Sequence, residues 1–320
     1  MNGQPAPRLN QLPHLPVSIT RAPRATPGAV PLCKDTGGVI AIGSQFYPAA
    51  GDAERRQSRA RAALLALDRV VPINLQFLDE DFQPAGFRTL RVLRRDSRTL
   101  TGAEGLRKPI VSDMFDALAG AARTAGCRYF AYLNNDIIVT QPAIDTILAG
   151  NRDGYAFSRV DVDPETGAET GIQIFGLDLF AIDAAWWTRE RRRFRPYIAG
   201  EACWDNVFAA LICAHGNGRV VNDRPGIYHE RHATAWNDGP FARYNGYLAA
   251  LDSPDFSRWV RYATRLNEML KSGVPGDRER LATELLSDPR LSAREAVVHA
   301  ARKVRARFKH AWAQYHRSSQ

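Results

Sequence analysis

Three polar residues inside an apolar run are the part of this sequence best suited to do chemistry. Asn134, Asn135 and Asp136 are set into the aromatic and β-branched segment 129–139. A carboxylate and two amides are costly to bury there unless something pairs with them. Uniformly apolar runs are typical of strands inside parallel sheets, which bind ligands at the carboxyl ends of their strands. One carboxylate with substrate phosphate oxygens suffices for Mg²⁺ or Mn²⁺. The alternative is a plain turn.

A second polar interruption lies in the apolar segment 175–180. Gly176 inside a predicted strand indicates a bulge or the close approach of a ligand to the backbone. Asp178 is an acid in an otherwise apolar run. It belongs either to the same site or to a plain strand whose acid points into solvent.

Two acids open a predicted helix over residues 201–215. Glu201 and Asp205 are four residues apart, so they face one side of the helix. Either is a candidate general base or a hydrogen-bond partner for sugar hydroxyls, and Trp204 could stack on a sugar ring. The simpler explanation is that the acids complement the positive helix N-terminus. The apolar residues that follow predict a buried helix, which favours a functional role for its acids.

Two histidines surround an acid in the segment 228–232. His229 and His232 could supply metal or phosphate ligands, although a single histidine on a loop is usually only a polar residue. The spacing differs from the helical H-E-x-x-H pattern of zinc proteases. The chain also lacks the glycine-rich phosphate loops of Rossmann dehydrogenases and P-loop NTPases, and the G-x-S-x-G elbow of many hydrolases.

The elements that must position these residues form an α/β pattern. Strands are predicted over 38–46, 70–78, 89–93, 129–139, 154–160, 171–182 and 219–222, and helices over 52–68, 109–125, 201–215, 243–251, 256–271, 277–286 and 293–315. Asp52 is expected to cap the first helix. The order predicts a mostly parallel central sheet flanked by helices, with a helical C-terminal extension. We expect a flexible lead-in over 1–35, a site-bearing domain over 36–240 and a helical region over 241–320.

Composition narrows the class of protein. The 320 residues are 45% hydrophobic and 24% charged, which is typical of a globular protein, and no run of 18 apolar residues predicts a membrane-spanning helix. The four cysteines show no CxxC pairing, which argues against a zinc site or a disulfide scaffold and favours the reducing cytoplasm.

The net charge of +9 points to an anionic partner, and much of it is local. Residues 291–320 hold seven Lys or Arg and one acid, Glu295. The helix predicted there has apolar residues at helical spacing among basic ones, namely Val297, Val298, Ala301, Val304 and Phe308. It either lies on an anionic membrane, at the inner face, or docks on the domain with a solvated basic face. We expect no nucleic-acid partner.

Taken together, the four clusters resemble the GT-A class of nucleotide-sugar glycosyltransferases, of the family-2 type. In that class a parallel α/β half binds the nucleotide, and a D-x-D-type motif at a strand end holds a divalent metal. A glycine-containing strand, an acidic motif opening a helix and a late histidine follow. The resemblance covers roughly residues 38–235.

The resemblance implies roles for particular residues. Asn134, Asn135 and Asp136 match the D-x-D, with Asn134 in place of the first acid, so the metal would rest on Asp136 with His229 or His232. Gly176 falls at the glycine loop, and Glu201 or Asp205 at the acidic motif. Nucleotide contacts are implied for the following further residues: Asp79, Asp81, Lys108, Asp113, Asp178 and Trp204.

The implied reaction moves a sugar from a nucleoside-diphosphate sugar to an acceptor hydroxyl, of a glycan or another molecule. The cofactor is Mn²⁺ or Mg²⁺, which neutralises the departing diphosphate. If the reaction inverts, Asp205 is the preferred base over Glu201. A sugar-nucleotide pyrophosphorylase shares the sheet but needs a glycine-rich loop that residues 43–48 lack. The non-enzymatic alternative is a nucleotide-binding or membrane-docking module with a degenerate GT-A fold.

Overall fold

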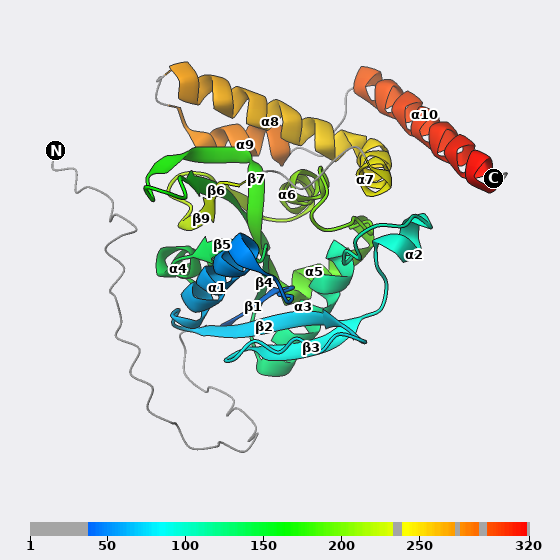
Figure 1. The fold of residues 1–320 in the computed structure, drawn as a ribbon. Helices are drawn as coiled ribbons and strands as arrows, with labels where there is room; N and C mark the ends of the chain where they lie inside the picture. The colour runs from blue at the N-terminus through cyan, green and yellow to red at the C-terminus, as the bar shows by residue number, and fades with distance from the viewer. Residues whose placement is uncertain (1–37, 233–238, 273–275, 288–292, 319–320) are drawn as a thin grey trace, which may run out of the picture.

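The computed structural model describes residues 38–232, 239–272, 276–287 and 293–318. The lead-in predicted over 1–35 lies outside the described residues. Within them, a nine-stranded sheet is flanked by helices and followed by further helices at the C-terminal end (Figure 1). Five of its eight strand pairings are parallel. The prediction of an α/β fold with a mostly parallel sheet and a helical C-terminal region is confirmed.

The strands and helices have the following bounds. The strands are β1 Ile40–Ser44, β2 Val70–Phe77, β3 Arg88–Leu93, β4 Tyr129–Leu133, β5 Ile137–Val139, β6 Gly154–Val162, β7 Glu169–Asp183, β8 Gly218–Val221 and β9 Ile227–Glu230. The helices are α1 Gly51–Leu65, α2 Ser97–Thr101, α3 Val111–Ala125, α4 Gln141–Ala149, α5 Ala184–Glu190, the short 3₁₀ helix η2 Arg191–Arg193, α6 Trp204–His215, α7 Pro240–Leu251, α8 Ser253–Ser272, α9 Arg278–Leu286 and α10 Ala293–Ser318.

The sheet has a parallel part and a mixed part. Its order is β3-β2-β1-β4-β7-β6-β9-β5, with β8 also paired to β6. The first four strands are parallel, β7 runs antiparallel to β4 and β6, and β5 is antiparallel to β9. The mixed part therefore places the ends of β4, β6 and β9 close to one another.

Apolar side chains alternate between the two faces of the sheet. In β4, Tyr129, Ala131 and Leu133 pack with α1 and α4, whereas Phe130 and Tyr132 pack with α3, α5 and α6. This alternation follows from the two-residue period of a strand. Both faces are covered by helices, which is why the central strands are apolar throughout.

The structure differs from the sequence-based expectation in several places. The run 129–139 is not one strand, because residues 134–136 form a turn between β4 and β5. Strand β9 was not among the predicted strands. Helices α2, α4 and α5 and the short η2 were not expected. The predicted Asp52 cap is wrong, because Ala50 occupies the N-cap position of α1 and provides no side-chain bond, while Asp52 lies in the first turn.

The C-terminal helices pack on the α6 side of the sheet. Trp259, Tyr262 and Leu266 of α8 are buried in the same cluster as the apolar side of α6. Helix α10 lies beside α7 at the edge of the molecule (Figure 1). Among the described residues, no helix combines the length and the apolar character that crossing a bilayer requires.

Candidate functional site

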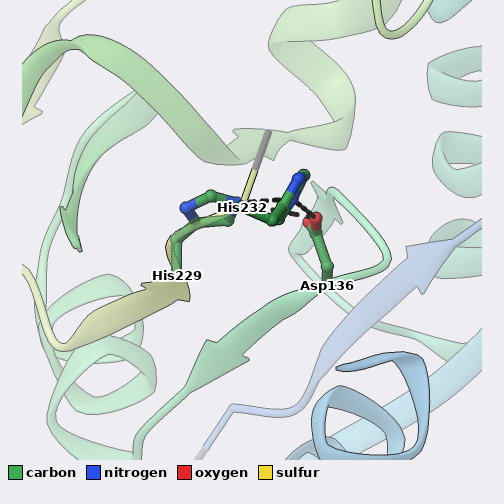
Figure 2. A group of neighbouring side chains, drawn as sticks. All are labelled: Asp136, His229 and His232. Carbon is green, nitrogen blue, oxygen red and sulfur yellow. Dashed lines mark hydrogen bonds and ion pairs between the residues drawn. The ribbon is translucent and has the colours of Figure 1, made fainter. Parts of the chain in front are cut away.

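A carboxylate and two imidazoles converge beyond the end of β4. His232 Nε2 lies 3.1 Å from Asp136 Oδ2, and His229 Nε2 lies 3.1 Å from His232 Nε2 and 3.6 Å from the same Asp136 oxygen. Figure 2 shows the three side chains pointing toward one another. One ligand atom from each lies within 4.8 Å of the others. This spacing allows the three groups to bind one metal ion.

Strand register explains why these residues meet. Strand β5 pairs antiparallel with β9, and Ile137 is opposite His229, so Asp136 in the preceding turn lies beside that histidine. His232 follows just after the end of β9. Asn135 holds the turn in place, because its side-chain amide donates to the carbonyl oxygen of Gln45 at 2.9 Å.

Glu230 fixes the backbone between the two histidines. Its buried carboxylate accepts hydrogen bonds from Arg55, at 2.5 and 2.8 Å, and from Arg59, at 2.8 Å, both on α1. Burial alone would raise the pKa of Glu230, but the bond from Arg55 together with the charges of Arg55, Arg59 and Arg56 outweighs burial, and the pKa lies below its ordinary value. Helix α1 thus supports the strand that presents His229.

Asp161 sets the orientation of His229. The Nδ1 atom of His229 lies 3.1 Å from Asp161 Oδ1, which also accepts a bond from Arg159 Nε at 2.9 Å. Because an ionised carboxylate can only accept, Nδ1 of His229 carries the proton. Its Nε2 atom is then the one that faces Asp136. A carboxylate behind a metal-binding histidine is a common supporting contact.

The imidazoles also determine the ionisation of Asp136. Burial opposes its charged form, but the hydrogen bonds of His229 and His232 outweigh burial and hold the pKa of Asp136 well below its usual range. The acid is therefore an anion at neutral pH. An anionic oxygen with two imidazole nitrogens suits Mn²⁺ or a later transition metal better than Mg²⁺, which prefers oxygen ligands.

Asn134 does not take part in this cluster. Its side-chain amide donates to Asp178 Oδ1, and its own Oδ1 accepts a bond from the hydroxyl of Tyr132 at 3.0 Å. The backbone N–H of Asn134 also donates to the Asp178 carbonyl oxygen, at 3.2 Å. Asn134 is thus engaged with β7, which leaves Asp136 as the carboxylate of the cluster.

Asp178 is linked to the cluster of Asp136, His229 and His232 through Arg159 and Asp161. Arg159 donates to Asp178 Oδ2 at 2.8 Å, so this arginine bridges Asp178 and Asp161. Burial raises the pKa of Asp178, although Arg159 acts against the shift. Gly176 leaves room for that guanidinium group, since a Cβ atom there would lie 3.2 Å from the Arg159 Cζ and Nε atoms. Gly176 therefore has a packing reason that needs no ligand.

Asp205 lies in the first turn of α6, beside β7. Its Oδ1 accepts from the Asn206 side chain at 2.6 Å, and its Oδ2 is 3.5 Å from the backbone nitrogen of Leu177. Burial, together with the charge of Asp178, raises the pKa of Asp205 to about 6, against the effect of the Asn206 bond. A carboxylate with a pKa near neutrality is suited to accept a proton from a hydroxyl group.

The neighbouring residues of the acidic motif have other environments. The prediction that Glu201 shares a helix face with Asp205 is wrong, because α6 begins at Trp204 and Glu201 precedes it. Glu201 is buried and pairs with Lys108 Nζ at 2.7 Å. Cys203, with φ of 79°, occupies the left-handed region at the N-cap of α6, a conformation that costs a non-glycine residue energy and often marks functional sites. Burial raises the pKa of the Cys203 thiol to about 11, which disfavours a thiolate nucleophile.

Trp204 lies in the hydrophobic core. Its side chain packs against Tyr132, Phe180 and Phe208 at ring-centroid distances of 5.8, 5.2 and 5.8 Å, and the residue is 3% exposed. A ring without an exposed face has no surface for a sugar. The stacking role is therefore corrected to a packing role.

Three of the acids expected to contact a nucleotide form ion pairs. Asp79 pairs with Arg107 at 2.7 Å, Asp113 with Arg95 at 2.5 Å, and Asp81 with Arg91. The nucleotide contacts of these acids and of Lys108 stay predictions. Arg159 and Asp161 were not among the site residues predicted from the sequence. Their spacing of two residues places both on one face of β6, a signal that could have indicated a shared site.

No protein-family model and no curated protein matches the sequence. Among solved structures, the chain is similar to the glycosyltransferase GlyE of Streptococcus pneumoniae TIGR4, with 13% identity, 78% of this chain and 63% of that chain covered, and a TM-score of 0.35. It is also similar to the mannosyltransferase PcManGT of Pyrobaculum calidifontis, solved with GDP-Man and Mn²⁺, with 13% identity, 92% and 83% covered, and a TM-score of 0.37. The chain thus spans less than two thirds of GlyE.

Proposed function

We propose that this protein is a glycosyltransferase that moves a sugar from a nucleoside-diphosphate sugar to an acceptor hydroxyl. The observation that carries the proposal is the convergence of Asp136, His229 and His232 at the strand ends of an α/β sheet. A divalent cation held there would neutralise the departing diphosphate. The order of a strand-end acid, a glycine-containing strand, an acidic helix start and a late histidine resembles that of GT-A enzymes.

In the proposed reaction, Asp205 accepts the proton of the acceptor hydroxyl. The acceptor oxygen forms a bond to the anomeric carbon, the bond from that carbon to the diphosphate oxygen breaks, and the nucleoside diphosphate leaves with the electron pair. Asp205 is preferred over Glu201 because its pKa is about 6, whereas Glu201 is engaged by Lys108 at 2.7 Å. This assignment applies to an inverting reaction.

Residues behind the cluster have positioning roles in this proposal. Asp161 holds the His229 ring, and Arg159 holds Asp161 and Asp178. Arg159 also offsets the charges of Asp161 and Asp178, which would lower their repulsion of a diphosphate bound at the cluster. The cytoplasmic location and the glycan acceptor stay predictions from the sequence.

A non-catalytic nucleotide-binding module is the second candidate. The observation that favours it is the engagement of Asn134 by Asp178, which leaves one carboxylate where the resembling enzymes have two. Such a module would bind a nucleoside diphosphate without transferring or hydrolysing the sugar.

Both candidates can be tested together. Thermal-shift measurements with Mn²⁺, Mg²⁺ and Zn²⁺ and a panel of UDP, GDP, CDP and their sugars should give metal-dependent stabilisation, since binding to the native state raises its stability. Asp136→Ala should remove the metal-dependent part, and Asp145→Ala, an exposed acid on α4, is the matched control. Metal-dependent release of sugar from the stabilising nucleotide supports the enzyme, and binding without release supports the module. Stabilisation by no nucleotide at all contradicts both.

A further inference from the structure

Helix α10 turns its polar side toward the protein and its apolar side toward solvent. Five residues spaced four, four, three and four apart form the side that is buried or half-buried: Glu295, His299, Lys303, Ala306 and His310. The His299 Nδ1 atom is 2.9 Å from the Ser253 hydroxyl oxygen, and the His310 ring stacks on Tyr247 with centroids 4.1 Å apart. The docking contacts of this helix are thus made by polar residues.

The opposite side is an apolar stripe. Its members follow one another at spacings of four, three, four and three residues and are all exposed: Val297, Ala301, Val304, Phe308 and Ala311. The exposed fractions of Val297, Val304 and Phe308 are 69%, 67% and 72%. A helix that only covers a domain packs such a stripe inward. In α10 the stripe instead faces outward, where it can contact an apolar surface outside the domain.

Basic residues flank the apolar stripe. With about 100° per residue, Arg305 and Arg307 lie roughly 80° to either side of the line through Val304 and Phe308. Lys309 is also exposed, and Glu295, the single acid of the helix, is paired with Arg261 at 2.7 Å. The exposed side of α10 is therefore apolar in the middle and cationic along its edges.

We propose that α10 docks this protein on an anionic lipid surface. An apolar stripe with basic edges matches a membrane interface, where the stripe enters the acyl boundary and the cations meet lipid phosphates. A second copy of the chain is a poorer partner, because pairing two such faces would bring the arginine rows together. Residues 1–37 are also a poorer partner, since they carry four basic residues and one acid and have the same sign of charge.

Vesicle flotation of the full chain tests the proposal. The protein should float with phosphatidylcholine vesicles that contain phosphatidylglycerol, should float far less with phosphatidylcholine alone, and should be released as salt is raised. Val304→Ser with Phe308→Ser should weaken binding at least about tenfold, because the stripe supplies the apolar part of the affinity. Val92→Ser, which changes an exposed apolar residue on β3, is the control.

A second pair of variants separates charge from apolar contact. Arg305→Gln with Arg307→Gln should also weaken binding and flatten its salt dependence, and Arg94→Gln with Arg192→Gln removes two exposed charges elsewhere as a control. All the substituted side chains are exposed, and unchanged circular dichroism would verify folding. No flotation of the wild-type protein with anionic vesicles overturns the proposal, as does flotation of both α10 variants that equals that of the wild type. The proposal would also be overturned, in favour of self-association, if the wild type formed dimers in solution and the Val304 and Phe308 substitutions abolished them.

Discussion

His229 and Asp161 form a hydrogen-bonded pair directly behind the candidate metal site, with 3.1 Å between Nδ1 and Oδ1. The pair joins β9 to β6 and leaves the Nε2 atom of the imidazole facing Asp136. In this arrangement the protonation of one ring nitrogen determines which nitrogen can bind a cation. The contact therefore makes Asp161 a positioning residue whose effect can be measured.

Asp161→Ala should weaken Mn²⁺ binding. Loss of a carboxylate that orients a metal-binding histidine typically costs about 10- to 100-fold in affinity. The Mn²⁺ dissociation constant can be measured by electron paramagnetic resonance of the free ion. Asp163→Ala is the matched control, because Asp163 lies two residues further along the chain and its side chain accepts hydrogen bonds from Glu165 and Thr166 in the following turn. Equal affinities in the two variants would show that Asp161 has no positioning role.

Asn134→Asp should not improve the metal site, although it restores the acid of a D-x-D motif. The new carboxylate would face Asp178, which Asn134 now bonds through its amide, and two like charges in a buried setting oppose one another. We expect a loss of roughly 1–3 kcal/mol in the free energy of unfolding and no tighter Mn²⁺ binding. Urea unfolding and metal titration would check both. Tighter metal binding with unchanged stability would mean that Asn134 belongs to the metal site.

Asp205→Asn should stabilise the protein at alkaline pH while lowering activity. The pKa of Asp205 is raised from 3.8 to about 6 in the folded state, so the native state holds a proton more tightly than the unfolded state does. The stability that this proton provides is complete below pH 3.8 and is lost as pH rises through about 6. The asparagine variant should therefore be more stable above pH 7 by roughly 1–3 kcal/mol, and the difference should shrink in acid.

The same residue predicts the pH dependence of transfer. The rate with wild-type protein should rise as Asp205 loses its proton near pH 6, and Asp205→Asn should lower kcat by roughly 10²- to 10⁴-fold without abolishing Mn²⁺ binding. A rate measured from pH 5 to 8 with the stabilising sugar nucleotide would verify this. Full activity of the asparagine variant would exclude Asp205 as the base.

Trp204→Ala should lower stability rather than only substrate binding. The ring is buried among Tyr132, Phe180 and Phe208, and removing a buried aromatic side chain typically costs about 3–5 kcal/mol. Trp204→Phe should lose much less, because it keeps an aromatic ring in the core. Thermal unfolding of both variants would check this. An alanine variant with unchanged stability but a raised KM would support the sugar-stacking role instead.

The sequence predicted the layers of the fold better than the local form of the site. The apolar runs of β1 and β4 and the helical pattern of α3 indicated a covered parallel sheet, because hydrophobic periodicity reflects burial directly. The turn at Asn134 was not expected, since Ile137–Val139 continues the apolar pattern after it. The short β9 was missed because its polar residues bind other side chains rather than the core.

The residues that support the Asp136, His229 and His232 cluster were harder to predict from the sequence. Asp136, His229 and His232 were named as metal ligands, and the structure brings the three together. The contacts of Asp161 and Arg159 arise because β6 pairs with β9 and β7. A local sequence pattern does not show which strands pair. The ion pairs of Asp79, Asp81 and Asp113 join residues 28, 10 and 18 positions apart, so the pattern within a single helix or strand does not show them.

The most direct test of a metal-assisted site at Asp136 is a Mn²⁺ titration that is monitored by electron paramagnetic resonance. It compares the wild-type protein with the variants Asp136→Ala, His229→Ala and His232→Ala. We expect wild-type binding of one Mn²⁺ per chain that a nucleoside diphosphate tightens, and a loss of at least about tenfold in affinity for each variant. Asp145→Ala should bind as the wild type does. Wild-type affinity in all three variants, or nucleotide binding that chelator leaves unchanged, would contradict a metal-assisted site at Asp136.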